Sequence, residues 1–119
     1  MGRAMQVVQA HVGKVKLTFI NVHLESTKDF SKQRKEQLVN CLEEMKGAED
    51  EVTVILGGDL NIRDSEVSSL QGGRGLPSNV YDVWECLGSR KDVQYTWDCM
   101  RNTNLQVCAA YISVKRHSF

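Results

Sequence analysis

The sequence lacks the marks of membrane, secreted and zinc-binding proteins. No apolar run in its 119 residues is long enough to span a bilayer, and the N-terminus has no apolar stretch before a small-residue cleavage site. The four cysteines form no Cys-x-x-Cys pair and no zinc spacing with histidine, and no Asn-x-Ser/Thr sequon is present. The Met1-Gly2 opening does not fit myristoylation, because Gln6 stands where Ser or Thr is needed. These absences predict an intracellular protein with reduced thiols.

An excess of charge of one sign is also missing. Fifteen basic and fifteen acidic side chains give a formal net charge of zero, so no overall field draws in nucleic acid, and any DNA contact depends on a local patch. Hydrophobic residues make up 41% of the chain and charged residues 25%, which is typical of a globular protein. Because the sequence shows no repeat and no linker, we expect one unit.

Hydrophobic periodicity predicts strands and helices along the chain. Alternating apolar residues favour strands over 5–12 and 15–24, joined as a hairpin by the turn Gly13-Lys14. Further along, the pattern predicts a helix over 28–46, a strand over 52–56, short helices over 64–70 and 81–87, a loop over 72–77 and a last strand over 105–114. In the helix over 81–87 we expect Val83, Trp84 and Leu87 to face inward, with Trp84 in the core.

The helix over 28–46 is amphipathic and is expected to cover other elements. Its apolar stripe contains Phe30, Leu38, Cys41, Leu42 and Met45. Its charges are expected to form a solvated face made of Lys32, Arg34, Lys35, Glu36 and Glu43. We expect Asp29 or Ser31 to cap its N-terminus and Gly47 to end it.

The stretch Gly57-Gly58-Asp59-Leu60-Asn61 directly follows the apolar strand over 52–56. Glycine permits a sharp, close-packed backbone, and Asp59 and Asn61 point at one ligand when Leu60 turns the other way. A carboxylate accepts a proton or holds a metal, and an amide hydrogen-bonds an oxyanion. The motif fits an active site, with an ordinary polar turn as the alternative.

Three polar clusters follow apolar strands or loops. They are His23-Leu24-Glu25-Ser26, Asp59-Leu60-Asn61-Ile62-Arg63 and Tyr95-Thr96-Trp97-Asp98. Brought to one rim, these groups suit phosphodiester chemistry. Asp59 would deprotonate a water and Asn61 would fix that water or the transition state.

The remaining polar residues would bind the phosphate and a base. His23, Ser26 and Arg63 would neutralise phosphate oxygens, and Trp97 would offer a stacking surface. Structural alternatives stay open for each. His23 would be an ordinary polar residue at a strand end, Ser26 a helix cap and Trp97 part of the core. Arg63 would pair with Asp64 or Glu66.

Five segments, taken in order, resemble the endonuclease/exonuclease/phosphatase superfamily. They are Asn21-Val22-His23-Leu24-Glu25-Ser26-Thr27, Gly58-Asp59-Leu60-Asn61-Ile62-Arg63-Asp64, Gly75-Leu76-Pro77, Asp82-Val83-Trp84-Glu85 and Tyr95-Thr96-Trp97-Asp98. Gly-Asp-x-Asn is shared widely, whereas His-Leu-Glu-Ser-Thr and Tyr-Thr-Trp-Asp are similar to the 5′-tyrosyl-DNA phosphodiesterases. The resemblance implies an α+β fold, a partial four-layer α/β/β/α sandwich of the DNase I-like type.

The resemblance also implies an activity and a site. The activity is hydrolysis of 5′-phosphotyrosyl bonds between DNA ends and topoisomerase II remnants, with magnesium, or manganese in its place. Its setting is nuclear DNA repair, with the cytoplasm as a second compartment and no membrane contact. The catalytic residues would be Asp59, Asn61 and His23. The substrate-binding and DNA-binding residues would be His23, Leu24, Glu25, Ser26, Thr27, Lys28, Asn61, Ile62, Arg63 and Trp97.

The chain departs from the family pattern at both ends. The upstream Gln-Glu motif, whose glutamate holds magnesium, and the downstream Ser-Asp-His motif have no counterpart within residues 1–119. We therefore expect an incomplete catalytic domain with no metal ligand of its own and negligible hydrolysis in isolation. A non-catalytic product that binds DNA or a protein is the alternative. A phosphoinositide phosphatase or sphingomyelinase of the same superfamily is a third hypothesis, which the two specific motifs disfavour.

Overall fold

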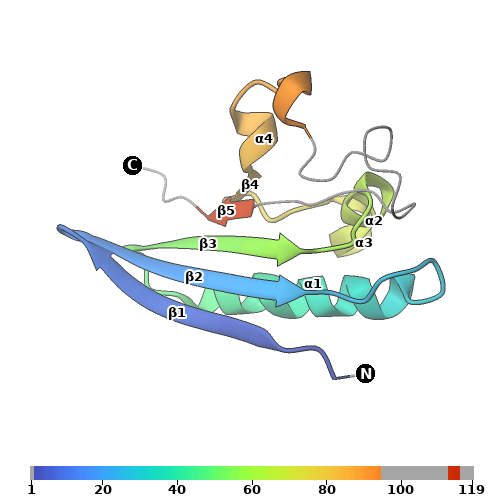
Figure 1. Ribbon diagram of the computed structural model, residues 1–119, viewed down its shortest axis with the longest axis horizontal. Coiled ribbons are helices and arrows are strands. Elements are labelled where there is room, and N and C mark those ends of the chain that lie inside the picture. The colour runs from blue at the N-terminus through green and yellow to red at the C-terminus, as the bar shows by residue number, and fades with distance from the viewer. Residues whose placement is uncertain (1, 95–112, 116–119) are drawn as a thin grey trace.

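The structure is a computed structural model that describes residues 2–94 and 113–115 (Figure 1). Its elements are β1 (Met5–Val12), β2 (Val15–His23), α1 (Ser31–Gly47), β3 (Val52–Asp59), α2 (Asp64–Ser68), α3 (Leu70–Gly73), β4 (Val80–Asp82), α4 (Val83–Cys86), a 3-10 turn at Lys91–Val93 and β5 (Ser113–Lys115). The predicted site segment 95–98 lies outside the described residues, as does the predicted strand over 105–114 except for its last two positions. Within the described ranges, no helix is both long enough and apolar enough to cross a membrane.

Five strands form one mixed sheet in the order β1-β2-β3-β5-β4. Strands β1 and β2 form the predicted antiparallel hairpin, with Val12 opposite Val15 across a turn where Gly13 has a φ of +59°. Strands β2 and β3 run parallel and are connected through α1. Strand β5 lies between β3 and β4 and is antiparallel to both. The parallel pair brings the C-terminal ends of β2 and β3 side by side.

Helix α1 lies against one face of this sheet (Figure 1). Alternate residues of β2 and β3 turn toward the helix, and Ile20, Val54 and Leu56 are at most 2% exposed. From the helix, the same core receives Leu38, Cys41, Leu42 and Met45. Burial of each large apolar side chain contributes about 2 kcal/mol. The amphipathic helix was therefore predicted with the correct role.

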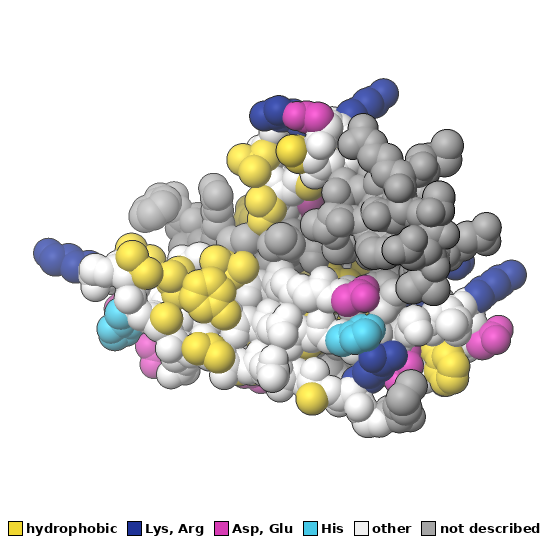
Figure 2. All heavy atoms as spheres, viewed as in Figure 1, with side chains coloured by type: hydrophobic (Ala, Val, Ile, Leu, Met, Phe, Trp, Pro, Cys, Tyr) yellow, Lys and Arg dark blue, Asp and Glu magenta, His cyan; other side chains and the backbone are white. Residues whose placement is uncertain are grey.

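The opposite face of the hairpin carries apolar side chains at the surface. Val8 lies opposite Phe19 in the strand register, and these side chains are 58% and 40% exposed. Val12 and Val15, near the turn, are 65% and 52% exposed. Figure 2 shows the resulting hydrophobic patch over one end of the strands, with histidine and charged side chains both beside it and toward the other end. A DNase I-like sandwich places its second sheet against such a face.

The N-terminus of α1 differs from the prediction. The helix begins at Ser31, and its N-cap residue Phe30 makes no side-chain cap hydrogen bond, so the predicted caps Asp29 and Ser31 are wrong. The Ser31 hydroxyl donates to Glu66 instead. Phe30, predicted on the apolar stripe, is 45% exposed. The predicted end at Gly47 is confirmed.

Arg34 is the main correction to the predicted charged face of α1. Arg34 is 1% exposed, although the prediction placed its side chain in solvent. The position is four residues before Leu38, and therefore falls on the buried stripe of the helix. A charged side chain at that position needs buried partners.

Two segments after β3 also differ from the prediction. Strand β3 continues through Asp59, so the Gly-Gly-Asp part of the motif belongs to the strand and not to a turn. The helix predicted over 64–70 divides into α2 and α3, and α3 takes in the start of the predicted loop. Inside α3, Gln71 and Gly72 have φ values of +50° and +68°, which an α-helix cannot contain.

The segment predicted as a helix over 81–87 begins as strand β4. The Asp82 carboxylate then starts α4 by accepting hydrogen bonds from the backbone N–H groups of Trp84 and Glu85, at 2.8 and 3.2 Å. Leu87 is 70% exposed, so its predicted inward direction is wrong. Trp84 is partly exposed and its indole N–H donates to the carbonyl of Arg90 at 2.8 Å, so it is not a core residue.

The described cysteines differ sharply in environment. Cys41 is buried in the core, and burial raises the pKa of its thiol to about 11, whereas Cys86 is exposed. We predict that iodoacetamide at pH 8 alkylates Cys41 at least about 100-fold more slowly than Cys86, because a pKa raised by two units leaves about 100-fold less thiolate. Peptide mass spectrometry over time measures both rates. Equal rates in the folded protein would contradict the placement of Cys41.

Candidate active site

His23 and Asp59 meet where the parallel strands β2 and β3 end. The two residues are direct partners in the strand register, and the imidazole Nε2 lies 3.7 Å from the Asp59 carboxylate Oδ2. Their side chains are 58% and 57% exposed, so water and a ligand can reach both. The C-terminal ends of parallel strands are a common place for active sites. The structure thus brings the first two predicted clusters together.

A close backbone approach supports this pairing. Gly58 has a φ of +131°, and a Cβ at this position would stand 1.9 Å from the carbonyl oxygen of Val22 on the neighbouring strand. Only glycine fits there without moving the strands apart. The backbone N–H of Leu24 then donates to the carbonyl of Asp59 at 2.9 Å, which continues the contact beyond the strands. At Gly57, by contrast, a Cβ would meet nothing within 4 Å.

Asn61 joins the same region from the loop after β3. Leu60 is 1% exposed and points into the core, while Asp59 is exposed and Asn61 half-buried, which is the alternation that the sequence predicted. Asn61 has a φ of +47°, a backbone conformation that Asn tolerates better than most residues. Its side-chain amide donates to the carbonyl of Leu24 at 3.2 Å. The amide therefore ties the two loops together.

The loop after β2 presents only some of its predicted side chains. Leu24 is 3% exposed, and its backbone N–H and carbonyl already bond Asp59 and Asn61, so a ligand does not reach this residue. The Glu25 carboxylate is mostly buried and pairs with the Arg3 guanidinium at 3.3 Å. Thr27 and Lys28 are exposed and Ser26 is half-buried. The alternative that Ser26 caps α1 is wrong, because the N-cap is Phe30.

The loop after β3 contributes two more predicted residues. Ile62 is 1% exposed and belongs to the core, so its side chain is out of reach of a ligand. Arg63 is exposed, and its backbone N–H donates to the Glu66 carboxylate at 2.9 Å. Trp97 lies outside the described residues. The described site therefore centres on His23, Asp59 and Asn61.

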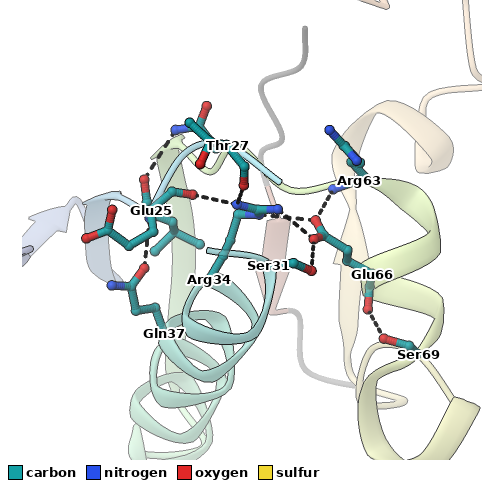
Figure 3. A network of polar contacts seen from close by, with 10 residues as sticks. Glu25, Thr27, Ser31, Arg34, Gln37, Arg63, Glu66 and Ser69 are labelled. Atoms are coloured by element: carbon teal, nitrogen blue, oxygen red, sulfur yellow. Dashed lines mark hydrogen bonds and ion pairs between the residues drawn. The ribbon is translucent and has the colours of Figure 1, made fainter. Parts of the chain in front are cut away.

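A buried polar network lies behind these loops, and the sequence analysis missed it. The guanidinium of Arg34 donates to the Glu66 carboxylate through two bonds of 3.1 and 2.6 Å (Figure 3). The same guanidinium donates to the carbonyls of Glu25 and Thr27 at 2.9 and 2.8 Å. The spacing of Arg34 on the apolar stripe was the signal for its burial. Its partner Glu66 stands three residues after Arg63, where a helix accepts a capping carboxylate.

The network determines the ionisation of Glu66. Burial alone would raise the pKa of this carboxyl, but hydrogen bonds from Arg34, Ser31 and the Arg63 N–H, together with the Arg34 charge, outweigh burial and lower the pKa to about 2. The carboxylate therefore stays charged at all but the most acidic pH. A charged pair at this depth is stable only while both partners are present.

Two hollows of the described structure are separate from this site. One, of about 330 Å³, is lined by residues of α1, α2, β4 and α4, among them Leu38, Asp64, Tyr81 and Glu85. Neither His23 nor Asp59 borders it. We place the candidate site by its chemistry at the strand ends and not by the size of a hollow.

The close approach at Gly58 gives the first site prediction. Gly58→Ala should destabilise the chain by about 3 kcal/mol or more, because the new Cβ collides with Val22 backbone in a strained conformation. Gly57→Ala is the matched control and should change stability by less than about 1 kcal/mol, since its Cβ meets open space. Urea unfolding measures the free energy of unfolding of both variants. Similar losses for the two variants would contradict the strand pairing.

The Glu66 pKa gives a pH prediction. Its folded value of about 2 lies below the ordinary value of 4.5, so its contribution to stability is present above about pH 4.5 and is lost as the pH falls toward about 2. The loss should be about 3 kcal/mol. Glu66→Gln should flatten this part of the curve of unfolding free energy against pH, while Glu36→Gln on the exposed face should not. An unchanged slope in Glu66→Gln would contradict the buried pair.

Known proteins match the chain in sequence. Tyrosyl-DNA phosphodiesterase 2 of Gallus gallus is 45% identical over 107 residues, which cover 90% of this chain and 28% of the relative. The Homo sapiens protein of the same name is 43% identical over 110 residues, which cover 92% of this chain and 30% of the relative. The chain thus spans less than a third of the curated relatives it matches. No protein-family model matches it.

Solved structures match the fold. The crystal structure of Danio rerio TDP2 complexed with single strand DNA product aligns with a TM-score of 0.85 and 35% identity, over 97% of this chain and 47% of that one. A sphingomyelinase C from Streptomyces griseocarneus, at 18% identity and a TM-score of 0.64, shares the fold alone. The predicted DNase I-like fold class is confirmed. In sequence and in fold, the chain is similar to part of the tyrosyl-DNA phosphodiesterases 2.

Proposed function

We propose that the chain is part of a phosphodiesterase that hydrolyses phosphotyrosyl bonds at DNA 5′ ends. The observation that carries this proposal is the meeting of His23, Asp59 and Asn61 where β2 and β3 end, on a chain related to tyrosyl-DNA phosphodiesterase 2. The solved relative with a single-strand DNA product supports a DNA end as ligand. Topoisomerase II remnants are the proposed adducts, and the proposed setting is the nucleus, with the cytoplasm as a second compartment.

In the proposed reaction, Asp59 accepts a proton from the attacking water. The water oxygen bonds to phosphorus, the bond from phosphorus to the tyrosine oxygen breaks, and the phenol oxygen leaves and takes up a proton. The products are a 5′-phosphate and a peptide with free tyrosine. Asp59 suits this role because its carboxylate is more than half exposed and water reaches it freely.

The neighbouring donors suit the growing charge on the phosphate. His23 lies beside Asp59 and can donate from its ring to a phosphate oxygen. Asn61 gives one amide N–H to Leu24 and has a second amide N–H for a ligand. The exposed cations Lys28 and Arg63 stand on the two loops that flank these residues. They supply the local basic patch that the neutral overall charge requires.

The proposed magnesium dependence rests on the family resemblance and not on the described residues. No group of three or more His, Cys, Asp or Glu side chains within residues 2–94 could hold a metal ion. The carboxylate ligands are expected elsewhere in a longer protein of this family. This observation favours, as a second candidate function, a non-catalytic product that binds DNA ends. Turnover distinguishes the two functions.

Binding to a DNA end tests the proposed site directly. We predict that the chain binds a single-stranded oligonucleotide with a 5′-phosphate more tightly than its 5′-hydroxyl counterpart. His23→Ala should weaken binding of the phosphorylated strand about tenfold, because a hydrogen bond to a charged group contributes roughly 1.5 kcal/mol or more. Fluorescence anisotropy measures both affinities.

His11→Ala is the control for this experiment. His11 is also exposed, but it lies near the opposite end of the hairpin, opposite Lys16. Its loss should leave the affinity unchanged. Equal affinity for phosphate and hydroxyl ends, or equal effects of the two histidine variants, would contradict the proposed site. In the same samples, magnesium-dependent release of tyrosine from a 5′-tyrosyl oligonucleotide, abolished by Asp59→Ala, would show that this chain alone is an active enzyme.

A further inference from the structure

We propose that Arg34 and Glu66 are positioning residues that hold the two loops of the candidate site at a fixed separation. The inference rests on the proposed function for its catalytic meaning. Neither side chain touches the place assigned to the phosphate. Both are buried behind it, and between them they bind backbone atoms of the loop 24–28 and of the segment 61–63 (Figure 3).

Arg34 holds the first loop through two carbonyls. A single guanidinium nitrogen, Nη1, donates to the carbonyl oxygens of Glu25 and Thr27 at 2.9 and 2.8 Å. Between these two carbonyls stands Ser26, which the family resemblance assigns to the phosphate. Thr27 has a φ of +68°, a conformation that a β-branched residue rarely adopts without support. The guanidinium supplies that support from inside the fold.

Glu66 holds the second loop through a backbone N–H. Its Oε2 accepts from the N–H of Arg63 at 2.9 Å and from the Arg34 Nε at 3.1 Å. Its Oε1 accepts from the Arg34 Nη2 at 2.6 Å and from the Ser31 hydroxyl. Arg63, the N-cap residue of α2 and two residues after Asn61, is therefore attached to α1. Each carboxylate oxygen has two donors, so the group has no spare freedom.

The two halves of the network meet again on the site side. The Asn61 amide donates to the carbonyl of Leu24, and the next N–H, that of Glu25, donates to the side-chain oxygen of Gln37 on α1 at 2.8 Å. The two loops are thus joined by the Asn61–Leu24 bond on the side of the candidate site and by the ion pair behind it. Apolar side chains of similar size would fill the same space, but they cannot bond two carbonyls and a backbone N–H. The polar pair therefore provides order in the loops that packing alone does not.

Arg34→Lys is the sharpest variant for this proposal. Lysine keeps a positive charge beside Glu66, but its single ammonium group cannot bond the carboxylate and both loop carbonyls in the arginine geometry. We expect an unfolding midpoint close to that of the parent chain, with at least tenfold faster amide hydrogen exchange at Leu24 and Glu25. Exchange in the paired interior of β2 and β3 should stay unchanged. Unchanged exchange at Leu24 and Glu25 in the folded variant would overturn the proposal.

A paired replacement separates positioning from stability even if Arg34→Lys does not fold. In Arg34→Met/Glu66→Leu no unpaired charge is left in the core, and such replacements often preserve stability. We again expect fast exchange at Leu24 and Glu25 in a folded chain. The matched control is Lys32→Met/Glu36→Leu, which removes an exposed pair of the same helix and should leave exchange unaltered. Parent-like exchange in the buried double variant would show that the pair only fills space.

DNA binding connects the positioning role to the proposed function. With the 5′-phosphorylated strand as probe, Arg34→Lys should weaken binding about tenfold, and the Lys32→Met/Glu36→Leu control should not. If the parent chain fails to bind this strand, the proposed function fails for this chain, while hydrogen exchange still decides the positioning role. Parent-like binding together with released loops would overturn the claim that the network serves the site.

Discussion

Strands β2 and β3 run parallel, and Gly58 lets their backbones approach so closely that a side chain there would collide with the Val22 carbonyl. Because of this register, His23 and Asp59 stand opposite each other at the strand ends. The buried stripe of α1 covers one face of the pair. The site is therefore a consequence of strand pairing, and its two loops only have to be held in place once the strands are paired.

Arg34 and Glu66 hold the two loops in place, and this arrangement buries two charges. Removing two charges from water is unfavourable, and the structure offsets the loss with two hydrogen bonds between the charged groups and one from the Arg63 N–H to Glu66. The low pKa of the Glu66 carboxyl is the sign that these bonds outweigh burial. An apolar pair would have been sufficient for a core. We infer that the charged pair is present because the loops of the site contain backbone groups that need partners.

The sequence predicted the hairpin, the covering helix, the strand over 52–56 and the alternation of Asp59, Leu60 and Asn61, because each follows from local periodicity. It misplaced Arg34, since residue type suggested solvent while spacing placed it on the buried stripe. Tertiary partners decide such cases, and a single sequence does not display them. The prediction that Trp84 lies in the core is wrong for a similar reason, because its indole N–H donates to a carbonyl at the surface. The resemblance proposed the site residues, which stay a prediction, and the structure added the network behind them.

A crystal structure of the chain with a 5′-phosphorylated single strand tests the central claim most directly. The account predicts that the 5′-phosphate lies at the shared end of β2 and β3, within hydrogen-bond reach of His23 and Asn61 and beside Asp59. Arg34 should keep its bonds to the loop carbonyls in that complex. A phosphate bound elsewhere, for example in the hollow between α2 and α4, with the strand ends left free, would contradict the account.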